Sequence, residues 1–279
     1  MNLSIEKQRL LQTLAAYFHT TNEHPQAWQG IATSKEVVDL ITEMGRLKLM
    51  LCGGAIHSIF TGTHVSDLDF YAKDARLLEE IKAFFVEKFL KQFPKTSVYV
   101  SPNALTYKRQ STTSRKVWTA QLITRFTGAP VEIFKTFDFT VTQGAFDFET
   151  GEFVLGGRFL QDIASRKLVY LGGSRFPICA MYRTKKYQAR GYSVPGSTIM
   201  HISLSIVRLE IKTYKDLKEQ LMGIDTMYLA NLLNSEKYDD ALPVDYGVFL
   251  VDAFEEFQGV PQDPEKFEML WQDNIMTDD

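Results

Sequence analysis

One stretch of the sequence, residues 51–70 (LCGGAIHSIFTGTHVSDLDF), constrains the fold more than any other part of the chain. It reads as a strand, a glycine pair, a short helix, a glycine turn and a second strand that carries Asp67 and Asp69. Side chains two positions apart in a strand point to the same face of a sheet, so the two aspartates present two carboxylates together. Such carboxylates repel each other unless a cation lies between them, and hard oxygen ligands suit Mg²⁺. The stretch therefore predicts a magnesium site on the second strand.

The glycine pair, Gly53 and Gly54, follows directly after an apolar run. Glycines allow the backbone to approach a phosphate closely, and the N-terminus of the helix that follows favours an anion. A phosphate cradle and two metal-binding carboxylates lie roughly fifteen residues apart, which indicates metal-assisted phosphoryl or nucleotidyl transfer.

Composition narrows the class of protein. The 279 residues are 45% hydrophobic and 23% charged, with a formal net charge of −3, so the chain lacks the overall basic charge of many nucleic-acid binders, although a local basic groove is compatible with it. Cys52 and Cys179 are far apart in apolar surroundings, which favours free buried thiols in a reducing compartment. The sequence has no signal peptide and no apolar run of about 18 residues, so we expect a cytoplasmic protein without a membrane segment.

Hydrophobic spacing predicts a mixture of helices and strands up to about residue 172 and helices alone beyond it. We therefore expect an α+β fold in three parts: a helical extension over residues 1–35, a mixed domain over 36–172 and a helical domain over 173–279. The helices are expected over residues 5–18, 34–45, 75–91, 130–137, 159–166, 177–190, 198–221, 225–233 and 246–257. The strands are expected over residues 47–52, 67–71, 97–100, 104–107 and 117–124, with a hairpin that pairs residues 139–148 and 152–155.

The segment GGAIHSIFTGTHVSDLDFY resembles the nucleotidyltransferase superfamily that includes DNA polymerase beta. More narrowly, it resembles the head domain of class II CCA-adding enzymes and bacterial poly(A) polymerases, whose motif runs G-G-x-V-R-D-x-L-L-G-x-x-x-x-D-x-D. The glycines and aspartates of that motif are kept in register at Gly53, Gly54, Gly62, Asp67 and Asp69. A second segment, FDFTVTQGAFDFETGEFV, resembles the family's R-R-D-F-T-I-N-A-x-A-Y-D-x-x-T-G-E block. RTKKYQARGY is similar, more weakly, to its neck helix, and the likeness ends near residue 192.

This resemblance implies a polymerase-beta-like head followed by a helical domain. It also implies Mg²⁺-dependent transfer of a nucleoside monophosphate from an NTP to a hydroxyl group, with release of pyrophosphate. The acceptor would be an RNA 3′ end such as that of a tRNA, a protein side chain or a small molecule. The resemblance implies two Mg²⁺ ions held by Asp67, Asp69 and a third carboxylate, for which Asp138 is our first candidate and Glu132 the alternative. Gln121 stands where some relatives place a glutamate.

The departures from the family pattern concern the parts that bind base and phosphate. Its R-D pair is His57-Ser58 here, and the R-R pair before D-F-T is Thr136-Phe137, so cations that would serve the nucleotide are replaced. Ser58 still suits a hydrogen bond to a phosphate, and His57 stays a nucleotide-binding candidate. The base-reading E-D-x-x-R element should fall at residues 175–179, which read RFPIC, and its absence argues against CCA synthesis on tRNA.

Further cations are candidates for binding the NTP. Lys108 and Arg109 follow a short strand and either face a triphosphate or protect a sheet edge from pairing. One face of the helix expected over residues 177–190 gathers three cations and an aromatic ring: Arg183, Lys186, Tyr187 and Arg190. This set suits the phosphates and base of a nucleotide, and the alternative is a solvated helix face on which the tyrosine snorkels.

Two other functions fit the same sequence. The replaced cations favour a degenerate member that binds a nucleotide or a partner protein without catalysis. The intact D-x-D at Asp67 and Asp69 opposes this, because two crowded carboxylates are costly without a metal to hold. The other alternative is a toxin-like transferase that modifies tRNA or a protein.

Overall fold

The computed structural model describes residues 4–18, 35–93, 95–110, 117–221 and 238–245. The chain divides into two compact units, Met1–Ala164 and Ser165–Asp279. The described part of the first unit contains a sheet with helices, and the named elements in the described part of the second are helices. The sequence predicted three parts, over residues 1–35, 36–172 and 173–279, and that finer division stays a prediction.

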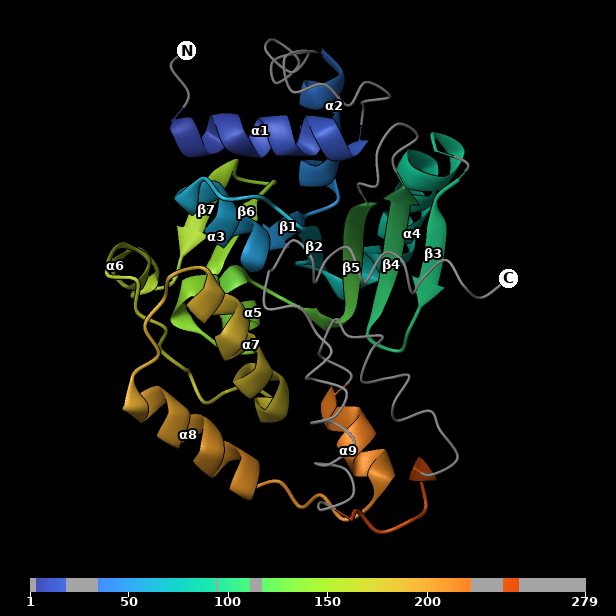
Figure 1. Cartoon of the computed structure of the whole chain (residues 1–279). Helices are drawn as coiled ribbons and strands as arrows, with labels where there is room; N and C mark the ends of the chain where they lie inside the picture. Colours follow the sequence, from blue (N-terminus) through green and yellow to red (C-terminus); the bar gives the residue numbers. More distant parts are fainter. Residues whose placement is uncertain (1–3, 19–34, 94, 111–116, 222–237, 246–279) are drawn as a thin grey trace. The chain divides into compact units, whose positions relative to one another are not determined.

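A seven-stranded mixed sheet forms the frame of the first unit (Figure 1). Its strands are β1 (Leu49–Cys52), β2 (Asp67–Ala72), β3 (Ser97–Val100), β4 (Ala104–Gln110), β5 (Val117–Thr127), β6 (Gly144–Asp147) and β7 (Glu152–Leu155). They lie in the order β3-β4-β5-β2-β1-β6-β7. Only β2 and β5 pair in parallel among these neighbours, and the other pairs are antiparallel. The α+β class expected from the sequence is confirmed.

One face of this sheet carries the main hydrophobic core. The helices of the first unit are α1 (Ile5–Phe18), α2 (Lys35–Arg46), α3 (Gly54–Thr61), α4 (Leu78–Phe85), α5 (Pro130–Phe134) and α6 (Phe159–Ala164). Short helical turns complete it: η3 (Ala75–Leu77), η4 (Val86–Lys91) and η5 (Thr140–Thr142). Leu14 and Phe18 of α1 and Phe85 of α4 pack in this core with Leu68 and Phe70 of β2. Because side chains alternate along a strand, Asp67 and Asp69 lie on the opposite face.

The opposite face carries a smaller apolar cluster. Met50 and Cys52 of β1, Tyr71 of β2 and Ala145 of β6 pack there with Ile133 of α5. The two aspartates of β2 therefore share their sheet face with a dry patch covered by a short helix. The main core holds the sheet from the other side, which leaves the aspartate face available for a site.

Gly45 lies inside α2 and does not end it, contrary to the sequence prediction. The helix runs on to Arg46, and the chain turns at Lys48, which has a φ of 51°. A Cβ atom at position 45 would lie 2.7 Å from the carbonyl oxygen of Phe148. The glycine therefore allows the close approach of two backbones that are far apart in sequence. Ser34, the expected N-cap, lies outside the described residues.

One strand and one helix differ from the sequence predictions. The strand expected over residues 139–148 is shortened to β6, because the chain first makes the turn η5. The single helix expected over 198–221 is two helices, α8 (Gly196–Val207) and α9 (Tyr214–Leu221). Asp216 accepts hydrogen bonds from the backbone N–H groups of Lys212 and Thr213, and these bonds lower its pKa. The Thr213 hydroxyl accepts one from the Asp216 N–H in return, so a capping box starts α9.

The second unit contains α7 (Pro177–Ala189) as well as α8 and α9. Pro177 occupies the first turn of α7, and Gly191, with a φ of 81°, follows its end as the sequence predicts. Tyr214, Leu217 and Leu221 of α9 form a small core with Tyr238. The loop expected over residues 20–29, the polar loop over 111–116, Pro94 and the helices expected over 225–233 and 246–257 fall outside the described residues.

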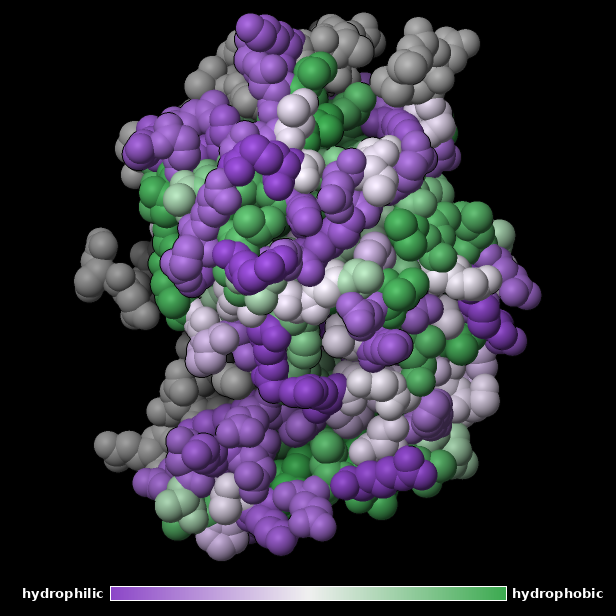
Figure 2. All heavy atoms as spheres, turned by 180° about the vertical axis from the view of Figure 1, so that it is seen from behind, coloured by the Kyte–Doolittle hydropathy of each residue, from purple (hydrophilic) through white to green (hydrophobic). Residues whose placement is uncertain are grey.

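The surface is mostly hydrophilic on the face displayed in Figure 2, with scattered apolar patches. Scattered exposed apolar side chains are normal for folded proteins, so these patches by themselves indicate no interface. Among the described helices, none has both the length and the apolar character needed to cross a bilayer.

Candidate functional site

The turn between β1 and α3 places the start of a helix beside a carboxylate. Gly53 has a φ of 81° and a ψ of −135°, a conformation essentially reserved for glycine. Its N–H donates to the carbonyl oxygen of Gly144 in β6 over 2.9 Å, which fixes the turn to the sheet. A Cβ atom at position 53 would lie 4.0 Å from Oδ2 of Asp69. The glycine turn and the carboxylate therefore line the same small region.

Asp67 and Asp69 lie on β2 with the same orientation. Both are half-buried, and Leu68 between them is fully buried in the main core on the other face. Asp69 pairs in register with Cys52 of β1 on one side and with Gln121 of β5 on the other. The carboxylate of Asp67 accepts a short hydrogen bond from the Ser66 hydroxyl. The two carboxylates thus project from one face at the centre of the sheet.

The neighbouring thiol of Cys52 adds no charge to this region. Cys52 is fully buried, and its burial, followed by the negative charges of Asp69 and Asp147, raises its pKa well above the ordinary value. The thiol therefore stays protonated and neutral at physiological pH. The charges that act on this thiol are the carboxylates of Asp69 and Asp147.

The donor set of this pair fits Mg²⁺ in a particular way. Within the described residues, no three His, Cys, Asp or Glu side chains gather as a metal site made of protein groups alone would require. Mg²⁺ is commonly held by one or two carboxylates together with substrate phosphates and water. The two carboxylates of Asp67 and Asp69 fit that mode.

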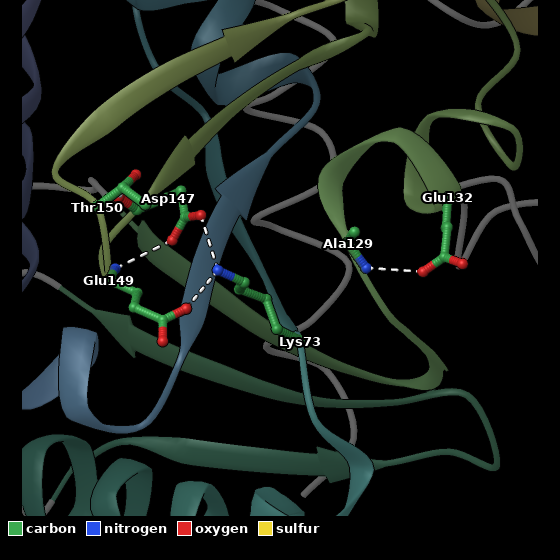
Figure 3. Close-up of polar contacts among 6 residues, drawn as sticks. All are labelled: Lys73, Ala129, Glu132, Asp147, Glu149 and Thr150. Atoms are coloured by element: carbon green, nitrogen blue, oxygen red, sulfur yellow. Dashed lines mark hydrogen bonds and ion pairs between the residues drawn. The ribbon is translucent and has the colours of Figure 1, made fainter.

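The two candidates for a third carboxylate are not gathered with this pair. Asp138 is buried in the segment after α5, and it forms no three-carboxylate group with Asp67 and Asp69. Glu132 accepts a hydrogen bond from the N–H of Ala129 over 2.8 Å, so its carboxylate caps the start of α5 (Figure 3). Glu132 is thereby committed to the helix, and a metal-binding role of Asp138 stays a prediction.

Phe137 lies where the resemblance would place a cation. Its ring carbon Cζ is 3.9 Å from the Cβ position of Gly53, and its ring packs edge-on against Tyr71 with centroids 6.1 Å apart. An aromatic wall therefore borders the glycine turn. This wall offers a surface for stacking where the sequence motif would have offered positive charge.

Lys108 and Arg109 point to opposite faces of the sheet. Lys108 pairs in register with Thr119, which pairs in turn with Asp67, so Lys108 shares the aspartate face at a distance of two strands, about 10 Å. Arg109 lies on the core face, where its Nη2 donates to the carbonyl oxygen of Ala16 over 2.9 Å. Its guanidinium lies 4.1 Å from the ring centroid of Phe93. The structure thus brings Lys108 to the face of the aspartates and does not bring Arg109 there.

His57 and Ser58 are both buried in α3, with 0% and 2% of their surfaces exposed. Ser58 lines a cavity of about 220 Å³ whose other walls come from α1, including Arg9 and Tyr17, and from Trp118. Because α1 covers the core face, Ser58 lies on the α1 side of its helix. Neither side chain is exposed to solvent beside Gly53, so their expected contact with the phosphates stays a prediction.

The candidates on α7 belong to the second unit. Lys186 is exposed, and Arg183 and Arg190 are partly so. Tyr187 is only 5% exposed, and its ring packs edge-on against Tyr192 with centroids 5.6 Å apart. The sequence allowed two roles for this tyrosine, stacking on a base or snorkelling to solvent. Its burial against Tyr192 fits neither role.

Comparison with known proteins identifies the family. A family model described as Gabija anti-defense 2 family protein matches residues 9–166, more than half of the chain. The chain belongs to the Gabija anti-defense 2 family. A protein of Bacillus phage SPbetaL7 named "Gabija anti-defense 2" is 32% identical over 203 residues, which are 72% of this chain and 48% of that protein. The chain thus spans about half the length of this curated relative.

Solved structures with a partial likeness are tRNA-processing enzymes. A Thermotoga maritima CCA-adding enzyme complexed with tRNA has a TM-score of 0.44 and 13% identity, covering 68% of this chain and 47% of that chain. A structure described as a tRNA-processing enzyme in an apo form has a TM-score of 0.46 and 12% identity, covering 86% of this chain and 63% of that chain. These values describe a remote likeness of the fold.

Two clusters of polar side chains in the first unit were not predicted from the sequence. Asp162 of α6 is fully buried and accepts hydrogen bonds from the Thr140 hydroxyl over 2.6 Å and from Nη2 of Arg158 over 2.8 Å. Lys73 bridges the carboxylates of Asp147 and Glu149 beyond the end of β2 (Figure 3). Both clusters join segments that are distant in sequence, so only the four-residue spacing of Arg158 and Asp162 was visible beforehand.

Replacing Arg109 by alanine is expected to weaken the fold by about 2 kcal/mol, because it removes a buried charge-assisted hydrogen bond to α1. Urea denaturation measures the loss. Lys108→Ala, one residue away on the aspartate face, is the matched control and should lose less stability. An Arg109 variant as stable as the wild type would contradict this assignment.

Proposed function

We propose that this chain is a Mg²⁺-dependent nucleotidyltransferase that moves a nucleoside monophosphate from an NTP to a hydroxyl acceptor. We further propose that it does so in opposing the Gabija defence for which its family is named. The observation that carries the proposal is the pair of carboxylates, Asp67 and Asp69, on one sheet face beside the left-handed turn at Gly53.

The chain's own residues would bind and orient the triphosphate. Backbone N–H groups at the start of α3, which begins at Gly54, are suited to phosphate oxygens because the first turn of a helix has unsatisfied donors and a positive dipole end. Asp67 and Asp69 would hold Mg²⁺, which when bound neutralises phosphate charge and lowers the pKa of the attacking hydroxyl. Phe137 would border the nucleotide and exclude water from one side of it.

The proposed reaction is a displacement at the α-phosphorus. The acceptor hydroxyl gives its proton to water, its oxygen forms a bond to the α-phosphorus, the bond from the α-phosphorus to the bridging oxygen breaks, and pyrophosphate leaves. Such chemistry depends mainly on positioning and electrostatics. Two carboxylates and backbone N–H donors are therefore the types of group that the reaction needs. RNA 3′ ends and protein hydroxyls are the acceptors to test, since a defence component is the target that the family name implies.

A second candidate function is nucleotide binding without transfer. It is favoured by the burial of His57, by the exchange of two cations for Thr136 and Phe137, and by a third carboxylate that is not gathered with the pair. This candidate predicts the same binding of NTP and Mg²⁺ but no labelled product.

Labelling separates the two candidates. The full chain is incubated with Mg²⁺ and each of four α-³²P-labelled NTPs, together with total RNA or with lysate from cells that carry or lack the Gabija system. We expect label to appear in a macromolecule with one preferred NTP, and to appear more strongly in lysates that contain the system. Labelling that needs neither Mg²⁺ nor intact Asp67 and Asp69 would overturn the proposal.

Thermal unfolding tests binding independently of an acceptor. At an NTP concentration of about 100 times the Kd, ligand binding stabilises the native state by about 2.7 kcal/mol, which raises the melting temperature measurably. The increase should require Mg²⁺ and should vanish with EDTA, because the carboxylates of Asp67 and Asp69 repel a bare triphosphate. An equal increase with and without Mg²⁺ would contradict the two-carboxylate site.

A further inference from the structure

The charge of the chain is strongly uneven along its sequence. Residues 163–209 contain eight Lys or Arg residues and no Asp or Glu. Because the whole chain has a formal net charge of −3, the remaining residues carry −11, with 23 basic and 34 acidic residues. The basic stretch lies almost entirely in the second unit, which begins at Ser165. A stretch this basic in an acidic chain favours a polyanionic partner.

Two arginines of this stretch rest on a pair of buried tyrosines. The guanidinium of Arg166 lies 5.3 Å from the ring centroid of Tyr192, and that of Arg190 lies 5.8 Å from the ring centroid of Tyr187. The two tyrosines are 3% and 5% exposed and pack edge-on against each other. We call these four residues the Arg166–Arg190 cluster. Rings of this kind restrict where the two guanidiniums can lie. A guanidinium has five N–H donors, so the hydrogen bonds that Arg166 makes to the Arg190 carbonyl oxygen and to the Tyr192 side chain use only part of them.

The backbone at Arg166 is held in an uncommon conformation. Its φ of 51° lies in the left-handed region, which costs a residue other than glycine free energy. The Ser193 N–H donates to the Arg166 carbonyl oxygen over 2.8 Å and holds this conformation. Nη1 of Arg166 lies 3.4 Å from the carbonyl oxygen of Arg190, at the end of α7. The strained backbone therefore brings the two arginines together.

Two exposed lysines flank the cluster. Lys167 follows Arg166, and its backbone forms an isolated parallel β-bridge with Ser193. Lys186 lies one turn of α7 before Arg190. In the described part of the chain, no carboxylate forms an ion pair with any of these four cations. The end of a helix favours one or two nearby cations, and four gathered without an acid exceed that need.

We propose that the second unit binds the phosphate backbone of a single-stranded nucleic acid at the Arg166–Arg190 cluster, with Lys167 and Lys186. Guanidiniums held in place by aromatic rings suit phosphate oxygens, which they bind through two parallel hydrogen bonds. Several neighbouring cations suit a polymer that carries one negative charge on each nucleotide. This surface goes beyond the proposed transfer reaction and does not depend on it.

Binding of fluorescent single-stranded RNA and of DNA of the same sequence, measured by anisotropy on the full chain without NTP, tests the proposal. The Arg166→Gln/Arg190→Gln variant should bind at least about tenfold more weakly. The slope of log K against log salt should fall by about 1.4, because two phosphate contacts are lost. The RNA and DNA arms show which strand is preferred, and preferential binding of either supports the surface.

The arginine variant alters a strained turn, so a second variant keeps the test independent of folding. Lys167→Gln/Lys186→Gln replaces two exposed side chains and should lower the salt slope by a similar amount. Lys215→Gln, on the exposed part of α9, is the matched control and should bind as the wild type does. Unchanged affinity and slope in both double variants would overturn the proposal. So would failure of the wild type to bind either strand, whether or not it binds vesicles that contain phosphatidylserine.

Discussion

Replacing Asp67 and Asp69 together by asparagine is expected to abolish nucleotidyl transfer while the protein stays folded. Asparagine keeps the shape of each side chain and removes both negative charges that would hold Mg²⁺. Loss of one preorganised electrostatic group commonly costs on the order of 10²-fold in rate or more, and the double change should exceed that. Transfer of label from α-³²P NTPs, and circular dichroism with thermal unfolding for the fold, are the measurements.

Asp74→Asn is the matched control for this experiment. Asp74 follows the same strand, and its hydrogen bonds from Arg76 lower its pKa to about 2, so it is an ionised aspartate away from the glycine turn. The control should transfer label at the wild-type rate. A double variant that also transfers at the wild-type rate would remove the site from Asp67 and Asp69. A wild-type protein that binds NTP with Mg²⁺ but transfers nothing would favour the non-catalytic candidate.

The arrangement of the candidate site was predictable because it depends on local rules. Strand alternation alone puts Asp67 and Asp69 on one face, and the apolar run before Gly53 marks the strand that enters the turn. Features within about twenty residues of one another were therefore interpretable from sequence.

Features that depend on strand length and on distant packing were not predictable. The strand around Arg109 was expected to end at Tyr107, but β4 continues to Gln110, so Arg109 follows Tyr107 onto the core face. The polar end of that strand resembles a loop, and nothing local shows that Ala16 accepts its hydrogen bond. Gly45 is similar, because the backbone that requires it belongs to Phe148.

The sequence contains a signal for the break between α8 and α9, but the apolar pattern across both helices predicted a single helix. Thr213 and Asp216 have the spacing of a capping box, which starts a helix, yet the apolar residues on both sides suggested one continuous helix. Two backbone N–H groups bonded to one carboxylate stabilise a helix start more than the apolar pattern stabilises continuity. The capping residues therefore decide where α9 begins.

Replacing Asp162 by alanine is expected to destabilise the first unit by about 2 kcal/mol, because it leaves the buried Thr140 hydroxyl without its acceptor. The ion pair with Arg158 is lost as well, but that side chain is 51% exposed and can be hydrated. Asp162 is fully buried and accepts hydrogen bonds from Thr140 and from both Nε and Nη2 of Arg158. The hydrogen bond to Asp162 also raises the pKa of Arg158. Urea denaturation at neutral pH measures the loss, and Leu160→Ala, on the exposed side of α6, is the matched control.

The Asp162 bond also bears on the candidate site, because Thr140 lies two residues after Asp138. Asp162→Asn keeps one acceptor for the Thr140 hydroxyl, so it should cost less stability than alanine and remain folded. If Asp138 contributes to transfer, this variant should lower the transfer rate although Asp67 and Asp69 are intact. If Asp138 is purely structural, the variant should lose stability alone, with the transfer rate of the folded fraction unchanged. Equal stability of both Asp162 variants and the wild type would show that α6 and η5 are held together by packing and not by this buried carboxylate.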